Sequence, residues 1–138
     1  LSICNYYTGK KNKAYELFEN GYSINPKISR VRIIGYLQSK KFNFALPLLE
    51  FETQKNADAF NTKWLGQLYL MSKRYEDAVI FLNKSASINP NDPQTFFNLA
   101  GSHFYNNNKD EALTVINKCL SLSPNFPKAD EWKRKIQK

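Results

Sequence analysis

The side chains that most often do chemistry are scarce in this chain. Its 138 residues include one histidine, His103, and two cysteines, Cys4 and Cys119. His103 has no cysteine or histidine at ligand spacing, and the cysteines form no Cys-x-x-Cys pair. The sequence also contains neither a phosphate-binding loop nor a nucleophile elbow. We therefore predict no catalytic residue, no metal and no cofactor, and we expect all three of these side chains to be packed.

Paired carboxylates can act together as a general acid and a general base. Two such pairs, Glu76-Asp77 and Asp110-Glu111, recur at the same repeat position, 34 residues apart. Both fall in the first turn of a predicted helix, where negative charge interacts favourably with the helix dipole. We interpret them as structural, and predict that the protein is not an enzyme.

The helices that carry these residues repeat. Between Ala59 and Pro90 the sequence predicts a helix, a polar break at 72–74 and a second helix that ends at the proline. A shift of 34 residues places Leu65, Ala78 and Pro90 on Leu99, Ala112 and Pro124. Because neither helix can bury its apolar face alone, such pairs are expected to stack on one another.

This pattern resembles the tetratricopeptide repeat, a helix–turn–helix unit of 34 residues. The resemblance rests on Leu65-Gly66-x-x-Tyr69, Ala78, Leu82 and Pro90, and on Phe96, the aromatic that Thr62 replaces one unit earlier. It implies an all-α fold, a right-handed superhelical solenoid of antiparallel helix pairs with a C-terminal capping helix.

The units are predicted to form a single domain over residues 1–138. They are a truncated first repeat (1–26), an atypical repeat (27–58), two regular repeats (59–92 and 93–126) and the capping helix (127–138). In the atypical repeat, Pro47 lies inside the second helix and should kink it or delay its start. Because Leu1 falls part-way through a helical pattern, we expect the chain to be a fragment or a processed piece.

The resemblance also implies a binding surface. In tetratricopeptide arrays the first helices of successive units line a groove that holds extended or helical peptides. By repeat position, the groove residues here would be Tyr6, Tyr7, Lys27, Arg30, Ile34, Leu37, Phe60, Lys63, Gln67, Leu70, Met71, Gln94, Phe97, Phe104 and Tyr105. Their mixture of aromatic, basic and amide side chains suits a peptide with apolar anchors and some acidic or polar character. Some of them are expected to cover neighbouring helices instead.

A narrower version of this site follows from chaperone-binding members of the family, which hold a terminal carboxylate with Lys, Asn, Asn, Lys and Arg. Lys63, Gln67, Asn98 and Lys128 fall on the first four positions, and Trp132 replaces the arginine. This is a degraded carboxylate clamp, and chance agreement of polar residues is the alternative.

The net charge is +8, carried mostly by lysine. A coding bias explains this, and an acidic partner is the functional alternative. Basic pairs at the turns of three consecutive units (Lys10-Lys11, Lys40-Lys41 and Lys73-Arg74) would form a ladder facing nucleic acid or an acidic protein. The aromatic residues lie in the groove and not along this ladder, which disfavours nucleic acid.

We therefore predict a non-catalytic scaffold or adaptor that binds a partner peptide or helix in the groove. The alternative is an assembly segment of a larger protein, so a homo-oligomer remains open. No apolar run reaches the length of a membrane span. The sequence leaves the compartment unknown, and the lack of a disulfide framework slightly favours the cytoplasm.

Overall fold

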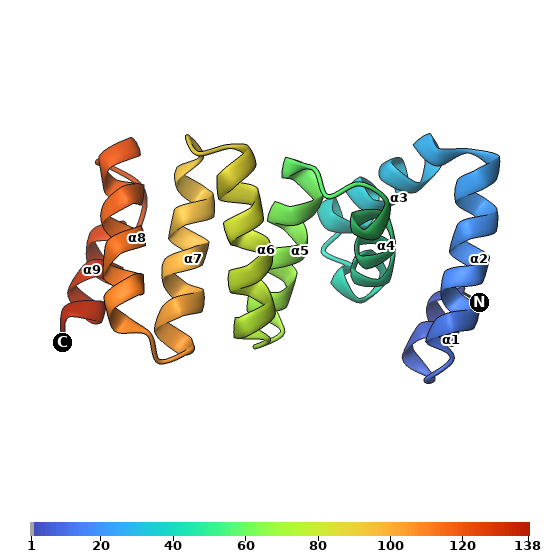
Figure 1. Cartoon of the computed structure of the whole chain (residues 1–138), viewed down its shortest axis with the longest axis horizontal. Coiled ribbons are helices and arrows are strands. Elements are labelled where there is room, and N and C mark those ends of the chain that lie inside the picture. Colours follow the sequence, from blue (N-terminus) through green and yellow to red (C-terminus); the bar gives the residue numbers. More distant parts are fainter. Residues whose placement is uncertain (1) are drawn as a thin grey trace. The chain divides into compact units, whose positions relative to one another are not determined.

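The computed structural model describes residues 2–138, and all regular structure in that range is α-helical. Within each of the two compact units described below, Figure 1 shows the helices packed as antiparallel pairs, such as α1 with α2 and α5 with α6. Their bounds are α1 (Ser2–Tyr7), α2 (Lys11–Ile24), α3 (Pro26–Gln38), α4 (Phe42–Lys55), α5 (Ala59–Met71), α6 (Tyr75–Ile88), α7 (Pro93–Tyr105), α8 (Lys109–Leu122) and α9 (Ala129–Gln137). The predicted all-α fold of helix pairs is confirmed.

Two compact units divide the chain, Leu1–Ala57 and Asp58–Lys138. The first contains α1 to α4 and the second contains α5 to α9. The second unit opens on a helix cap, because the Asp58 side chain accepts a hydrogen bond from the backbone N–H of Asn61 at 2.8 Å. Each unit buries its own apolar residues, as repeat positions require.

The recurring small and large residues lie between paired helices. Ala78 and Leu82 on α6 are fully buried, as are Ala112 and Ile116 on α8. Gly66 on α5 allows the closest approach, since a Cβ there would lie 2.6 Å from Leu82 Cγ. Because glycine has no Cβ, the Leu82 side chain of α6 can pack directly against the backbone of α5 at Gly66.

Each helix pair turns in the same way. The second residue of the turn has a left-handed backbone in all four pairs, with φ values of 86° at Gly9, 57° at Lys40 and 62° at both Lys73 and Asn107. The following backbone N–H then bonds a carbonyl one turn back in the helix, as from Arg74 to Tyr69 at 2.8 Å. This arrangement caps the carbonyls that the end of the first helix leaves unpaired.

Pro47 does not delay the second helix of the atypical repeat, contrary to one of the two predicted effects. Helix α4 begins at Phe42 and continues through Pro47. Proline has no N–H to donate to the carbonyl of Asn43, four residues earlier. The Tyr7 hydroxyl donates to that carbonyl instead, at 2.6 Å, so a side chain from α1 replaces the missing helical hydrogen bond.

Of the three side chains that we expected to be packed, two are. His103 and Cys119 are buried, and burial raises the pKa of the Cys119 thiol to about 11. The prediction for Cys4 is wrong, because this residue is exposed. Cys4 lies on the short helix α1 and lines a hollow in the first unit.

The packing of His103 should make the second unit sensitive to acid. Burial holds the pKa of His103 below its ordinary value of 6.5, although Glu111 partly offsets this. When a group has a lower pKa in the folded state, the unfolded state takes up the proton more readily, so the folded protein loses stability as the pH falls below the unfolded pKa. We therefore expect the unfolding free energy of Asp58–Lys138 to decrease below about pH 6.5.

The variant His103→Tyr tests this expectation, because Tyr69 holds the equivalent buried position one repeat earlier. Urea unfolding followed by tryptophan fluorescence should show a smaller acid-induced loss in the variant than in the wild type. Equal pH dependence in the two proteins would contradict the assignment.

Candidate functional site

A hollow of about 450 Å³ opens in the second unit between α5, α7 and α9. It is lined by Leu70, Met71, Lys73, Tyr75, Phe97, Asn98, Gly101, Tyr105 and Trp132, and we call it the α5–α7–α9 hollow. Four of the residues that we expected in a groove, Leu70, Met71, Phe97 and Tyr105, are thus brought together on one surface.

Aromatic rings form one wall of this hollow. Trp132 on α9 lies 6.3 Å from Phe97, 5.7 Å from Phe104 and 5.8 Å from Tyr105 between ring centroids. All three contacts are edge to face, the arrangement that aromatic pairs favour. By repeat position, Trp132 falls where the clamp of chaperone-binding domains has an arginine. The structure shows that it joins the capping helix to the aromatic residues of α7.

A polar side chain in the same wall has unused hydrogen-bonding capacity. Asn98 is only 7% exposed, and its Oδ1 accepts a hydrogen bond from Gln94 Nε2 at 3.0 Å. Its Nδ2 has no partner among residues 2–138. A buried donor without an acceptor costs about 1–3 kcal/mol, so a ligand that supplies an acceptor would be favoured here.

The other expected clamp residues do not line the hollow. Lys63 Nζ lies 2.6 Å from Asp92 Oδ2, within an ion pair. Burial by itself would raise the pKa of Asp92, but the hydrogen bond and charge of Lys63 outweigh it and hold that pKa below its ordinary value. Gln67 is half-buried, and Lys128 is exposed with a left-handed backbone just before α9. Phe60 and Gln94 are half-buried on α5 and α7.

The groove residues expected in the first unit mostly serve its packing. Tyr6 donates a hydrogen bond to Glu50 Oε2 at 2.8 Å, and Arg30 Nε lies 3.5 Å from Glu52 Oε2. The prediction that Leu37 lines the groove is wrong, since its side chain is only 7% exposed and belongs to the core. It follows the buried Ile33 by one helical turn, so it lies on the same face of α3. Ile34 and Lys27 are exposed.

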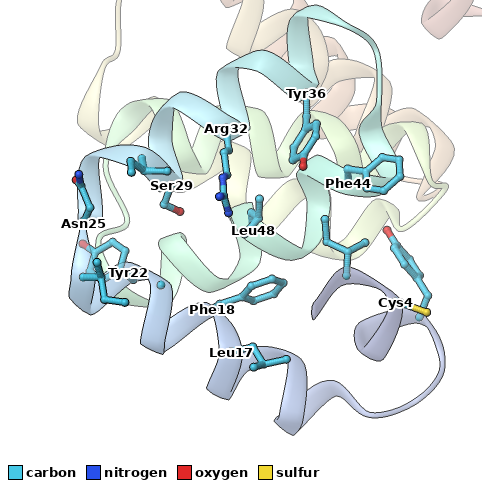
Figure 2. Close-up of a pocket in the computed structure, with 15 residues that line it drawn as sticks. Cys4, Leu17, Phe18, Tyr22, Asn25, Ser29, Arg32, Tyr36, Phe44 and Leu48 are labelled. Atoms are coloured by element: carbon cyan, nitrogen blue, oxygen red, sulfur yellow. The ribbon is translucent and has the colours of Figure 1, made fainter. Parts of the chain in front are cut away.

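A second hollow, of about 630 Å³, opens in the first unit, where the sequence analysis predicted no separate site. Figure 2 shows it between α2 and α3, which contact each other less than α6 and α7 do. We call it the α2–α3 hollow. Its walls include Phe18 from α2, Ile28 and Arg32 from α3, and Phe44 and Leu48 from α4. The signal available in the sequence was a pair of isoleucines, Ile24 and Ile28, on either side of Asn25-Pro26. The structure shows that both are exposed.

Two kinds of site are missing from the part of the chain that the structure describes. No three His, Cys, Asp or Glu side chains gather there as a metal centre would require. None of its helices combines the length and the apolar character that crossing a membrane needs.

One family model matches the chain, that of anaphase-promoting complex, cyclosome, subunit 3, over residues 36–119. These residues make up more than half of the chain. The chain belongs to this family. Its repeats are of the tetratricopeptide type, which confirms the resemblance seen in the sequence. No curated protein matches the chain in sequence.

Solved structures share the fold of this repeat protein. The MamA R50E mutant has a TM-score of 0.78 and 24% identity, over 89% of this chain and 93% of that one. The first TPR of Spaghetti (RPAP3), bound to the HSP90 peptide SRMEEVD, has a TM-score of 0.72 and 17% identity, over 80% and 88%. The Arabidopsis OM64 TPR domain has a TM-score of 0.73 and 14% identity, over 80% of this chain and 93% of that one. The repeats are thus a protein-interaction module of a typically non-catalytic family.

Proposed function

We propose that this protein is a non-catalytic adaptor whose Asp58–Lys138 unit holds a partner peptide or helix in the α5–α7–α9 hollow. The observation that carries the proposal is the convergence of Leu70, Met71, Phe97 and Tyr105 on that hollow. Met71 and Tyr105 are exposed there, and apolar side chains gathered in a concave surface are typical of peptide-binding sites.

The unpaired amide of Asn98 supports the same proposal. In a wall that is otherwise mostly apolar, one buried donor selects a ligand with an acceptor at one place. A peptide offers such acceptors in its backbone carbonyls and in a terminal carboxylate. The neighbour that holds the peptide SRMEEVD shows that a tetratricopeptide domain of this fold can bind a short segment.

A panel of phage-displayed random peptides, selected on the whole chain, tests the proposal. Selected peptides should bind the double variant Met71→Ala/Tyr105→Ala at least about tenfold more weakly than the wild type. Both side chains are exposed, but Tyr105 also contacts Trp132, so circular dichroism should first show that the variant keeps the helical content of the wild type. The matched control is Ile80→Ala/Ile88→Ala, which removes two exposed apolar side chains from α6 that do not line the hollow.

The same peptides, made with free and amidated C-termini, separate the two versions of the site. A clamp requires the free carboxylate, whereas backbone recognition does not. If the control variant weakens binding as much as Met71→Ala/Tyr105→Ala does, the hollow is not the binding site.

A further inference from the structure

The α2–α3 hollow carries one positive charge that no acidic residue of the described chain balances. Among the described residues that line it, Arg32 is the only charged one, and none is acidic. Figure 2 shows Arg32 extending from α3 toward Leu48. Arg32 has no ion-pair partner within residues 2–138, whereas Arg30, two residues earlier, pairs with Glu52. The hollow therefore contains an uncompensated positive charge.

The walls around this charge are mostly apolar and open to solvent. Ile28, Phe44, Tyr7 and Ile24 are exposed, although each lines the hollow. Contiguous exposed apolar side chains indicate an interaction surface more often than chance. The volume of about 630 Å³ is also in the range of pockets that bind ligands.

The unit as a whole attracts negative charge. Residues 1–57 contain nine Lys and Arg and four Glu, giving a net charge of +5. Two of the four acids, Glu50 and Glu52, are buried and paired within the unit. A third, Glu19, pairs with Lys55 at 2.6 Å. Most of the internal carboxylates are thus engaged, and Arg32 is left for a carboxylate from outside.

We propose that the α2–α3 hollow binds an acidic amphipathic segment of a partner protein. Its apolar side chains enter between Phe18, Ile28 and Leu48, and one of its carboxylates pairs with Arg32. A carboxylate can take two hydrogen bonds from one guanidinium, which fixes the register of the bound segment. This goes beyond the function proposed for the α5–α7–α9 hollow, because the site lies in the other unit and selects by charge.

The probe is a fluorescein-labelled peptide about four helical turns long, with leucines on one face and glutamates beside them. A companion peptide has glutamine in place of every glutamate. Fluorescence anisotropy with the whole chain should show that the acidic peptide binds at least about tenfold more tightly. Arg32→Gln should remove this preference, and Arg32→Lys should retain part of it.

Two matched controls test whether binding depends on the hollow itself or only on the positive charge and exposed apolar side chains of α3. Lys27→Gln removes one positive charge from the same helix outside the hollow, and should change the affinity little. Ile28→Ser should weaken binding, whereas Val31→Ser should not. Ile28 is 47% exposed and lines the hollow, while Val31 is 68% exposed and does not. Circular dichroism should show that all five variants keep the helical content of the wild type.

Several results would overturn the proposal. They are equal binding of the two peptides, equal losses in Arg32→Gln and Lys27→Gln, and concentration-dependent self-association that Ile28→Ser abolishes. The last result would place a second copy in the hollow instead. Loss of binding in Met71→Ala/Tyr105→Ala would move the peptide to the other unit, so failure of this inference is distinguishable from failure of the proposed function.

Discussion

Leu82→Ala is expected to lower the free energy of unfolding of the Asp58–Lys138 unit by about 3–5 kcal/mol. Leu82 is 0% exposed and lies against Gly66 on α5, so truncation leaves a cavity between the two helices. Urea unfolding followed by tryptophan fluorescence measures the change, since Trp64 and Trp132 both belong to this unit. Ile80→Ala, on the exposed face of the same helix, should cost less than about 1 kcal/mol.

The contact with Gly66 makes this prediction sharper. Gly66→Ala alone should destabilise the unit by about 1–2 kcal/mol, because the new Cβ would overlap Leu82 and overpacking exceeds the gain in helix propensity. In the Leu82→Ala background the same substitution should cost less, since Cγ and Cδ2 are gone and only the backbone nitrogen of residue 82, at 3.2 Å, stays close. Additive losses in the double variant would show that the two side chains do not compete for this space. Gly101→Ala is the control, because its Cβ would lie 3.8 Å from Leu70.

Glu50→Ala is expected to destabilise the Leu1–Ala57 unit by about 2–4 kcal/mol. The buried carboxylate of Glu50 accepts hydrogen bonds from the hydroxyls of Tyr6 at 2.8 Å and Tyr15 at 3.1 Å. Lys11 Nζ lies 3.6 Å from the same oxygen. Removing the carboxylate leaves these groups of α1 and α2 without their shared acceptor on α4. Hydrogen exchange should show faster opening of all three helices.

Two further measurements distinguish the network from simple burial. Burial, together with Glu50, raises the pKa of Tyr6 and of Tyr15 above the ordinary value of 10. Glu50→Gln removes the negative charge and should lower both pKa values, as ultraviolet titration of the phenols can detect. Glu16→Ala removes an exposed carboxylate from α2 and should leave exchange and titration unchanged. Tryptophan fluorescence, which reports the other unit, should not respond to any of these variants.

Periodicity predicted the parts of this fold that depend on one helix pair. Leu65 and Leu99 are buried as their shared repeat position requires, and so are Ala78 and Ala112. Such positions face the partner helix of the same pair, and the spacing of apolar residues records that face directly. The acidic residues at the start of α6 and α8 were likewise placed correctly.

The features that the sequence did not predict depend on neighbouring pairs. A 34-residue period implies that successive pairs stack evenly, so it could not indicate the gap between α2 and α3 that exposes Cys4 and Ile28. Nor does spacing show that Tyr7 satisfies the carbonyl freed by Pro47, because that contact joins helices far apart in sequence. Leu37 was assigned to the groove by analogy of repeat position, whereas its place one turn after Ile33 was the better guide. That the residues of the α5–α7–α9 hollow bind a peptide stays a prediction, which the peptide selection tests.

The shared turn geometry has a consequence for engineering. Glycine adopts a left-handed backbone without steric cost, yet only the first of the four turns has it, at Gly9. Lys40 and Asn107 bear that cost at their own turns, and neither lines the α2–α3 or the α5–α7–α9 hollow. A single glycine can therefore relieve this strain in one hairpin at a time, while the α2–α3 and α5–α7–α9 hollows keep their lining residues.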